Sequence, residues 1–266
     1  MLDFYNGCTM QLNPKPTARA MIKNTTPPRH RGIYLLPNLF TTGAMFGGFY
    51  AITSAINGRF ETAAIAMFIA MVLDGLDGRV ARLTNTQSEF GVQYDSLSDM
   101  VSFGAAPAIV MYLWTLSTMG QAGLFAAFVH MAGGALRLAR FNTQVETADK
   151  RYFQGLPSPA AAAVLAGGLL FCIENEYNVE NIKYLVLVTT ICTGLLMVSN
   201  FRYSSFKEID FKNKVPFIVA IIAMLAISFI MAQPQRMLFL MAVAYAFSGP
   251  IITLVQRKRK LQSRKA

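Results

Sequence analysis

The chain is dominated by apolar segments of the length that a bilayer-spanning helix requires. A helix needs about 20 mostly apolar residues to cross the hydrocarbon core, and such segments occupy residues 34–56, 61–83, 93–116, 121–143, 157–174, 181–200, 215–232 and 237–256. Hydrophobic residues make up 54% of the chain and charged residues 14%, a balance far from that of soluble domains. The sequence therefore predicts an all-α, polytopic membrane helix bundle of about eight transmembrane helices.

The distribution of positive charge predicts how this bundle is oriented. Short connections at residues 57–60, 117–120 and 233–236 force neighbouring spans to run antiparallel, so every loop can be assigned to one side. All but three of the 24 Lys and Arg residues then fall on the same side, and the exceptions are Arg59, Lys183 and Arg236. Because cytoplasmic loops carry the excess of Lys and Arg, we expect both termini in the cytoplasm.

This orientation divides the chain into three parts. We expect a basic cytoplasmic segment at residues 1–33, a transmembrane domain at 34–256 and a basic cytoplasmic tail at 257–266. The net charge of +10 suits attraction to anionic membrane lipids. Because the basic residues are spread over several segments beside apolar spans, no nucleic-acid partner is expected. The three cysteines show no C-x-x-C spacing, so neither a disulfide framework nor a thiolate metal site is indicated.

Four aspartates lie within the second and third predicted spans. Asp74 and Asp77 are three residues apart and Asp95 and Asp99 four apart, so each pair shares one face of its helix. An unpaired carboxylate at membrane depth is unfavourable, and intramembrane acids therefore mark candidate functional sites. Two facing carboxylate pairs predict a site for divalent cations. A ligand set of oxygen atoms alone favours Mg²⁺, Mn²⁺ or Ca²⁺ over zinc.

Other interpretations of this region remain open. The aspartates could form structural ion pairs with Arg79 and Arg82, although two arginines cannot balance four acids. Gly78 and Ala81 lie on the face of Asp74, and this strip of small residues could admit a ligand to the backbone or allow close packing against another helix. A cation-coupled transporter would also carry intramembrane aspartates. Against that class, these aspartates cluster near one cytoplasmic boundary beside Arg82.

The order and spacing of these residues resemble a known family. Residues 74–99 read D-x-x-D-G-x-x-A-R-x₈-G-x-x-x-D-x-x-x-D, which resembles the signature of the CDP-alcohol phosphatidyltransferases. These enzymes transfer the phosphatidyl group of CDP-diacylglycerol to an alcohol. The resemblance implies that Asp74, Asp77 and Asp95 hold the metals, two Mg²⁺ or Mn²⁺ ions, and that Asp99, also near the metals, is the catalytic base.

The same resemblance implies a set of contacts to the CDP-lipid. Gly78, Arg82 and Ser88 match positions that hold it, and residues 37–41, which read P-N-L-F-T, resemble a second nucleotide-contact segment. Without the resemblance, the polar residues of that segment would be ordinary residues at a helix N-terminus. The residues expected to contact the CDP-lipid are Asn38, Thr41, Gly78, Ala81, Arg82 and Ser88.

The acceptor alcohol is indicated by four further stretches. Residues 98–107, 137–142, 153–159 and 196–207 resemble bacterial type II phosphatidylserine synthases within the family, which implies L-serine as the acceptor. The alternative acceptors, glycerol 3-phosphate and inositol phosphate, would each need a further cationic pocket.

Four residues could contact serine. Ser102 lies seven residues after Asp95, on the aspartate face, where it could contact a small polar acceptor or simply pack against a helix. Arg137 and Arg140 share a helix face and could bind a carboxylate, or they could only extend toward the membrane surface. Asn142 could also contribute to the serine site.

The resemblance also places the chain in its cellular setting. It implies a homodimer in the bacterial inner membrane, with the active site facing the cytoplasm. Gly43 and Gly47 form a G-x-x-x-G pattern that could support close contact between helices. His130 and Trp114 are interpreted as packing or interface residues.

Overall fold

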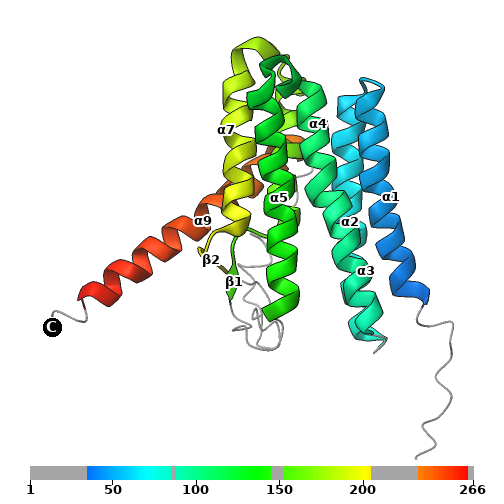
Figure 1. Cartoon of the computed structure of the whole chain (residues 1–266), viewed down its shortest axis with the longest axis vertical. Helices are drawn as coiled ribbons and strands as arrows, with labels where there is room; N and C mark the ends of the chain where they lie inside the picture. The colour runs from blue at the N-terminus through cyan, green and yellow to red at the C-terminus, as the bar shows by residue number, and fades with distance from the viewer. Residues whose placement is uncertain (1–34, 85–87, 145–151, 205–232, 263–266) are drawn as a thin grey trace, which may run out of the picture. The chain divides into compact units, whose positions relative to one another are not determined.

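The computed structural model describes residues 35–84, 88–144, 152–204 and 233–262. This part of the chain is almost entirely helical, as predicted (Figure 1). Its elements are α1 (Leu35–Ile56), α2 (Phe60–Leu83), α3 (Glu89–Asp99), the π-helical turn η2 (Met100–Ala105), α4 (Ala106–Trp114), the 3₁₀ turn η3 (Leu116–Met119), α5 (Gln121–Gln144), β1 (Tyr152–Gln154), α6 (Ser158–Glu174), α7 (Val179–Val198), β2 (Arg202–Ser204) and α9 (Pro234–Gln262).

Five of the described helical segments are long and apolar enough to cross a membrane. They span residues 37–56, 89–114, 121–143, 179–198 and 235–254, so the predicted class of a polytopic membrane protein is confirmed. The predicted span at 61–83 is present as α2, which carries charged residues near its end, and the span at 157–174 is present as the shorter α6. The span at 215–232 and the basic segment at 1–33 lie outside the described residues, and the count of eight stays a prediction.

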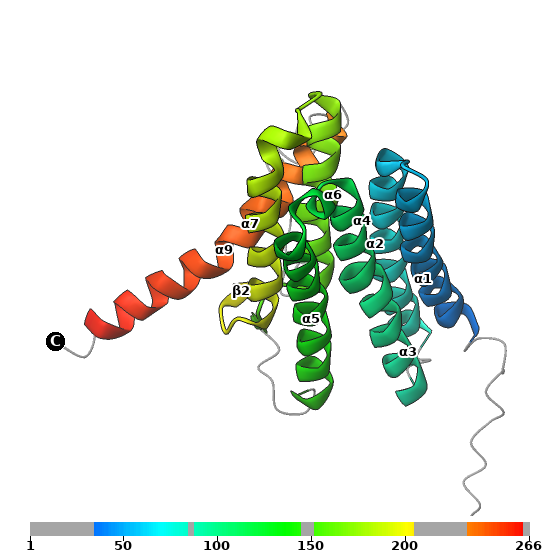
Figure 2. The ribbon, with the colours of Figure 1, turned by 45° about the horizontal axis from the view of Figure 1, so that its top comes forward.

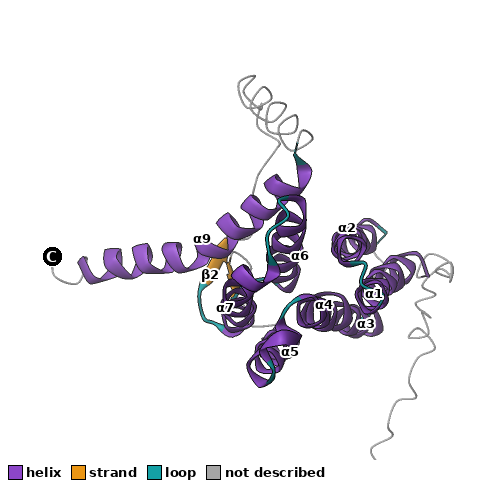
Figure 3. Ribbon diagram, turned by 90° about the horizontal axis from the view of Figure 1, so that it is seen from above, coloured by secondary structure: helices purple, strands orange, loops and turns teal. Residues whose placement is uncertain are grey.

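The helices pack as two neighbouring groups. Seen from above, α1 to α4 lie on one side and α5, α6 and α7 on the other, with α9 beside α6 (Figure 3). The closest helix pairs are α1 with α2, α5 with α7, and α6 with α9, and α2 connects the groups through α6. The C-terminal part of α9 diverges from the other described helices (Figure 2). The aspartate-bearing helices α2 and α3 are thus both held by α1.

Small residues allow α1 and α2 to approach closely. The buried core between them is rich in alanine, including Ala51, Ala55 and Ala63. A methyl group on Gly47 would lie 3.0 Å from the Cβ of Ala70, and one on Gly43 would lie 3.3 Å from a methyl of Leu73. The G-x-x-x-G pattern is therefore used for packing within one chain. The expected close contact between helices is thus confirmed for α1 and α2, and the homodimer stays a prediction.

His130 of α5 connects α7 of the second group with η2 of the first. Its side chain is fully buried. The Nδ1 atom lies 2.9 Å from the Thr193 hydroxyl of α7, and the Nε2 atom lies 3.2 Å from the Phe103 carbonyl of η2. A buried polar ring with both nitrogen atoms in hydrogen-bond contact is a structural residue. This confirms the interpretation of His130 as a packing residue, and Trp114 likewise packs against the main apolar core.

The π-helical turn η2 directly follows Asp99 and changes the direction of the side chains beyond it. A π-turn holds more residues per turn than an α-helix, so the seven-residue spacing of an ideal α-helix no longer fixes the direction of Ser102 relative to Asp95. The Ser102 side chain is fully buried, and its hydroxyl donates a hydrogen bond of 2.9 Å to the carbonyl of Ala44 in α1. Ser102 is therefore a packing serine. The expectation that it faces the aspartates as an acceptor contact is corrected.

A two-stranded antiparallel ribbon joins the residues before α6 to those after α7. β1 pairs with β2, with Phe153 opposite Tyr203. Gly155 follows β1 with a φ of +78°, a conformation that favours glycine. The Tyr203 side chain is fully buried, and its hydroxyl donates a hydrogen bond of 3.0 Å to the Ala246 carbonyl of α9. Burial raises the pKa of Tyr203 to about 12, so this donor stays protonated at neutral pH.

Candidate active site

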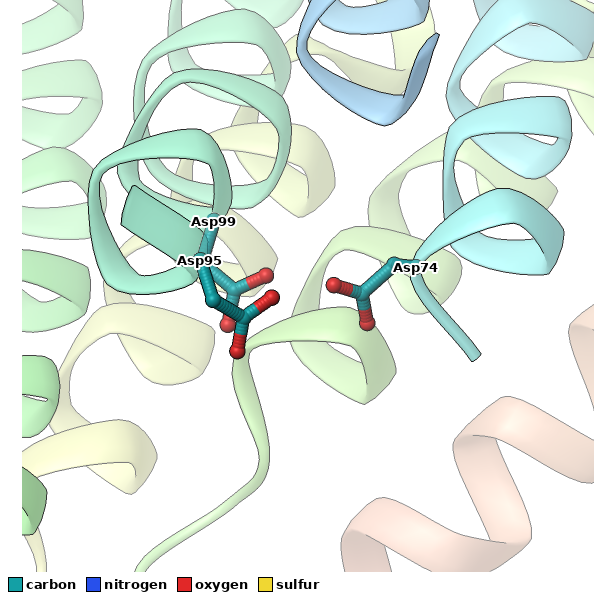
Figure 4. A group of neighbouring side chains, drawn as sticks. All are labelled: Asp74, Asp95 and Asp99. Atoms are coloured by element: carbon teal, nitrogen blue, oxygen red, sulfur yellow. The ribbon is translucent and has the colours of Figure 1, made fainter. Parts of the chain in front are cut away.

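Three aspartates from two helices face one another between α2 and α3. Asp74 belongs to α2, and Asp95 and Asp99 lie one turn apart on α3. Figure 4 shows the three carboxylates pointing toward one another across the gap between these helices. One oxygen atom from each lies within 4.8 Å of the others. Such a cluster could hold a metal ion.

The fourth aspartate, Asp77, completes the two facing pairs. Its carboxyl group is close enough to that of Asp95 to interact with it, and Asp74 stands in the same relation to Asp99. Asp77 is only 5% exposed. Its Oδ2 atom accepts a hydrogen bond of 2.8 Å from the hydroxyl of Thr41 in α1. The structure therefore brings together all four carboxyl groups that the sequence singles out.

The cluster carries more negative charge than its surroundings balance. The ion pairs found in the described part of the chain join Lys183 to Glu180 and Arg236 to Glu174, so none involves these aspartates. Arg79 and Arg82, the partners of the ion-pair interpretation, are both exposed.

Two carboxylate oxygen atoms in the cluster also lack a donor. Among the described residues, the buried Oδ1 atoms of Asp95 and Asp99 have no hydrogen-bond partner. Buried carboxylates need a compensating charge or donor. A divalent cation with oxygen ligands fits this donor set.

The surface beside the aspartate cluster is open along one strip of α2. Within the described part of the chain, a methyl group added to Gly78 would meet no atom within 4 Å, and the same is true of Gly75 on the adjacent face. Close helix packing, the alternative explanation for Gly78, is therefore not what the structure shows. Ala81 is half-buried and Arg82 exposed. A ligand could approach the α2 backbone next to Asp74 along this strip.

The other residues expected to contact the CDP-lipid differ in their surroundings. Asn38, near the start of α1, is half-buried beside the first turn of α3. Ser88 is exposed and caps α3, since its hydroxyl accepts a hydrogen bond of 3.0 Å from the Gly91 amide. The Thr41 hydroxyl is buried and turned toward Asp77. Thr41 thus lies within the helix interface, and its contact with the nucleotide stays a prediction.

The end of α5 lies against the aspartate cluster. Arg137 is half-buried, its Nε atom is fully buried, and the side chain lies near Asp99 without forming an ion pair with it. One guanidinium nitrogen donates a hydrogen bond of 3.0 Å to the Ser158 hydroxyl at the start of α6, while its Nε atom has no partner among the described residues. A guanidinium with a free donor suits a carboxylate or phosphate. Snorkelling toward the membrane surface does not describe this arginine.

Arg140 and Asn142 link the same end of α5 to two other segments. Arg140 donates a hydrogen bond of 3.3 Å to the Asn200 side chain after α7. The Asn142 amide lies 3.1 Å from the hydroxyl of Ser96, the residue after Asp95. Together with the bond from Arg137 to Ser158, these contacts join three of the four stretches that resemble serine-using enzymes, and Ser96 lies two residues before the fourth.

Sequence reasoning missed three residues that support this site: Ser96, Ser98 and Ser158. Ser98 and Ser158 lie within the stretches 98–107 and 153–159, and Ser96 lies just before the first of them. The resemblance of these stretches to serine-using enzymes could therefore have pointed to all three residues. Their partners depend on how α1, α3, α5 and α6 align against one another, and helical periodicity within one segment does not reveal that alignment.

Comparison with known proteins identifies similar enzymes. The sequence profile of the CDP-alcohol phosphatidyltransferases matches residues 34–249. The protein named CDP-diacylglycerol–serine O-phosphatidyltransferase from Helicobacter pylori is 37% identical over 221 residues, which cover 82% of this chain and 91% of the relative. Proteins of the same name from Mycobacterium leprae and Bacillus subtilis are 28% identical over 242 residues and 32% identical over 173 residues. These alignments cover 88% and 65% of this chain, and 80% and 92% of the relatives.

Proposed function

Because this chain belongs to the CDP-alcohol phosphatidyltransferase family, we propose that it transfers the phosphatidyl group of CDP-diacylglycerol to L-serine, giving phosphatidylserine and CMP. The relatives named for this reaction support serine as the acceptor. The observation that carries the proposal is the meeting of Asp74, Asp95 and Asp99 beside the buried guanidinium of Arg137. A metal cluster and a cation for the acceptor carboxylate thus lie side by side.

The four aspartates would hold two divalent cations, Mg²⁺ or Mn²⁺. Bound there, the ions would neutralise the diphosphate and stabilise charge on the attacking and leaving oxygens. Asp74, Asp77 and Asp95 serve as ligands. Asp99, also near the metals, accepts the proton of the serine hydroxyl as its oxygen attacks the phosphorus that carries the diacylglycerol. The new bond joins serine oxygen to phosphorus, the bond from that phosphorus to CMP breaks, and CMP leaves.

The open strip of α2 receives the CDP-lipid. The diphosphate approaches the backbone at Gly78, where an added Cβ would meet no atom of the described residues within 4 Å. The small side chain of Ala81 continues this strip, and Arg82 supplies a positive charge. Asn38 and Ser88 flank this strip from α1 and from the start of α3. The acyl chains remain in the bilayer while the nucleotide lies at the membrane boundary.

Arg137 binds the carboxylate of serine. Its side chain lies beside Asp99, the proposed base, and keeps one donor free among the described residues. Arg140 and Asn142, on the same helix as Arg137, complete the pocket. Arg140 connects it to the segment after α7, and Asn142 connects it to α3. A phosphorylated acceptor would need a second cationic pocket, and serine does not.

We propose that the enzyme lies in the bacterial inner membrane, with eight spans and both termini in the cytoplasm. The one-sided distribution of Lys and Arg supports this orientation. In this orientation the aspartates would lie at the cytoplasmic boundary, where a water-soluble amino acid can reach them. The family resemblance supports a homodimer.

The decisive experiment is an acceptor assay with purified full-length protein. CMP release would be measured with CDP-diacylglycerol and labelled serine, glycerol 3-phosphate or inositol phosphate, with and without EDTA. Serine-specific, metal-dependent release is expected. Release with a phosphorylated acceptor alone would overturn the serine assignment. Cation transport in proteoliposomes without any CMP release would overturn the enzyme.

A further inference from the structure

We propose that Thr41 is a positioning residue for the metal site, which orients the Asp77 carboxylate, and that Ser98 holds Thr41 in place from α3. The inference rests on the proposed function, because it assigns a role within the same aspartate site. It gives Thr41 a task different from contact with the nucleotide. In this arrangement α1, which carries none of the four aspartates, aligns the two helices that carry them, α2 and α3.

The first observation is the hydrogen bond between Thr41 and Asp77. Both side chains are almost completely buried, at 4% and 5% exposure. The Thr41 hydroxyl lies 2.8 Å from Asp77 Oδ2 and 3.1 Å from the carbonyl of Pro37. A hydroxyl has one proton to donate, and the shorter contact leads to the carboxylate. Hydrogen bonds to ionised groups are the stronger kind, so Asp77 is the partner that fixes this side chain.

The second observation links the same residue to α3. Ser98 is 1% exposed, and its hydroxyl donates a hydrogen bond of 3.0 Å to the backbone carbonyl of Thr41. Ser98 immediately precedes Asp99. One residue of α1 thus contacts an aspartate of α2 through its side chain and the neighbour of an aspartate of α3 through its backbone. The relative position of Asp77 and Asp99 depends on this connection.

The chemistry of the site explains why such a connection matters. A metal ligand must present its oxygen in a fixed direction, and hydrogen bonds from outside the ligand set supply that orientation. Loss of such a partner weakens metal affinity by about 10- to 100-fold. Asp77 lies on the buried side of the cluster, where Thr41 is its hydrogen-bond donor from α1. Without this donor the carboxylate could rotate out of the ligand geometry.

The test compares metal binding and catalysis in full-length Thr41→Val and Thr41→Ser variants. Free Mn²⁺ would be titrated by electron paramagnetic resonance in the absence of substrates, and the Mn²⁺ dependence of CMP release would be measured in parallel. Thr41→Val should bind Mn²⁺ about 10- to 100-fold more weakly, with unchanged KM values for both substrates at saturating Mn²⁺. Thr41→Ser keeps the hydroxyl and should restore the original affinity.

Ser98→Ala and Ser102→Ala form a matched pair for the second hydrogen bond. Both serines are buried and donate to carbonyls of α1, but Ser102 bonds to Ala44, away from the aspartates. Ser98→Ala should weaken Mn²⁺ binding, and Ser102→Ala should not. Equal loss in both variants would show that helix packing alone is responsible and would overturn the inference.

Two further outcomes separate this inference from the proposed function. Unchanged Mn²⁺ affinity in Thr41→Val would overturn the positioning role alone and leave the metal site standing. Absence of Mn²⁺ binding in the unaltered protein would overturn the metal site itself. If Thr41→Val does not fold, Thr41→Cys replaces it, because a thiol of similar size is only a weak donor. The Mn²⁺ affinity of Thr41→Cys should be lower than that of the unaltered protein, but it should not be lost completely. An unaltered Mn²⁺ affinity would count against the positioning role of Thr41.

Discussion

Arg137 of α5 donates a hydrogen bond of 3.0 Å to the hydroxyl of Ser158, the first residue of α6. Ser158 is completely buried, so this contact fixes the guanidinium at the end of the second helix group. The same guanidinium lies near Asp99 in the first group. Arg137 is thus anchored to the second group while it lies near an aspartate of the first, and the proposed serine pocket lies between this arginine and Asp99.

Replacement of Arg137 by lysine should impair serine binding specifically. Lysine keeps the charge but loses the planar fork that can donate to Ser158 and to a carboxylate at the same time. We expect the KM for serine to rise about 10- to 100-fold, as for a lost charge-assisted hydrogen bond, with little change in the KM for CDP-diacylglycerol. Steady-state CMP release at varied serine would measure this. An equal rise in both KM values would contradict a serine-specific role.

Replacement of Asp99 by asparagine should remove turnover and spare lipid binding. Asparagine has nearly the same shape but cannot accept the serine proton as a carboxylate does, and loss of a general base lowers the rate by about 10²- to 10⁴-fold. Binding of CDP-diacylglycerol, measured by titration calorimetry in detergent, should be largely retained. Turnover at the original rate in this variant would exclude Asp99 as the base.

Removal of divalent cations should abolish CMP release reversibly. The three clustered carboxylates supply oxygen ligands only, so activity lost to EDTA should return with Mg²⁺ or Mn²⁺. The measurement is CMP release after dialysis and addition of each metal in turn. Full activity in EDTA would contradict a metal-assisted mechanism.

His130 provides a prediction about stability instead of catalysis. His130→Phe would remove the side-chain partner of the buried Phe103 carbonyl, whereas the Thr193 hydroxyl would keep its bond to the Thr190 carbonyl. An unsatisfied buried polar group lowers the free energy of unfolding by about 1–3 kcal/mol. Thermal unfolding in detergent should show a lowered Tm. An unaltered Tm would mean that the ring contributes volume but no hydrogen bonding to the stability of the fold.

The sequence predicted those features that depend on one segment at a time. Apolar runs defined the described helices within a few residues, and spacing alone placed Asp74 with Asp77 and Asp95 with Asp99 on common faces. The error at Ser102 arose because its assignment assumed a straight α-helix, whereas η2 interrupts it. The π-turn has no simple signature in the residues, so the rotation of Ser102 toward Ala44 could not be anticipated.

Contacts between segments that are far apart in sequence could not be predicted from the periodicity of single segments. β1 and β2 have three residues each, too short to show the alternation that identifies a strand, and their pairing spans α6 and α7. The partner of Thr41 was missed for a related reason. Its hydroxyl could serve a helix N-terminus or a nucleotide by sequence, and only the alignment of α1 against α2 shows that it reaches Asp77.

Gly78 and Gly75 allow the lipid site to be tested with an internal control. An added Cβ at either position would meet no atom of the described residues within 4 Å. We therefore expect Gly78→Leu and Gly75→Leu both to fold, and each should gain stability from the better helix former, about 0.8–1 kcal/mol. Only Gly78 lies one helical turn from Asp74 on the strip proposed to receive the diphosphate. Gly78→Leu should therefore raise the KM for CDP-diacylglycerol strongly, while Gly75→Leu should change it little. CMP release at varied lipid, together with Tm values, would measure both effects. Equal KM values in the two variants would remove the open strip of α2 from the substrate site.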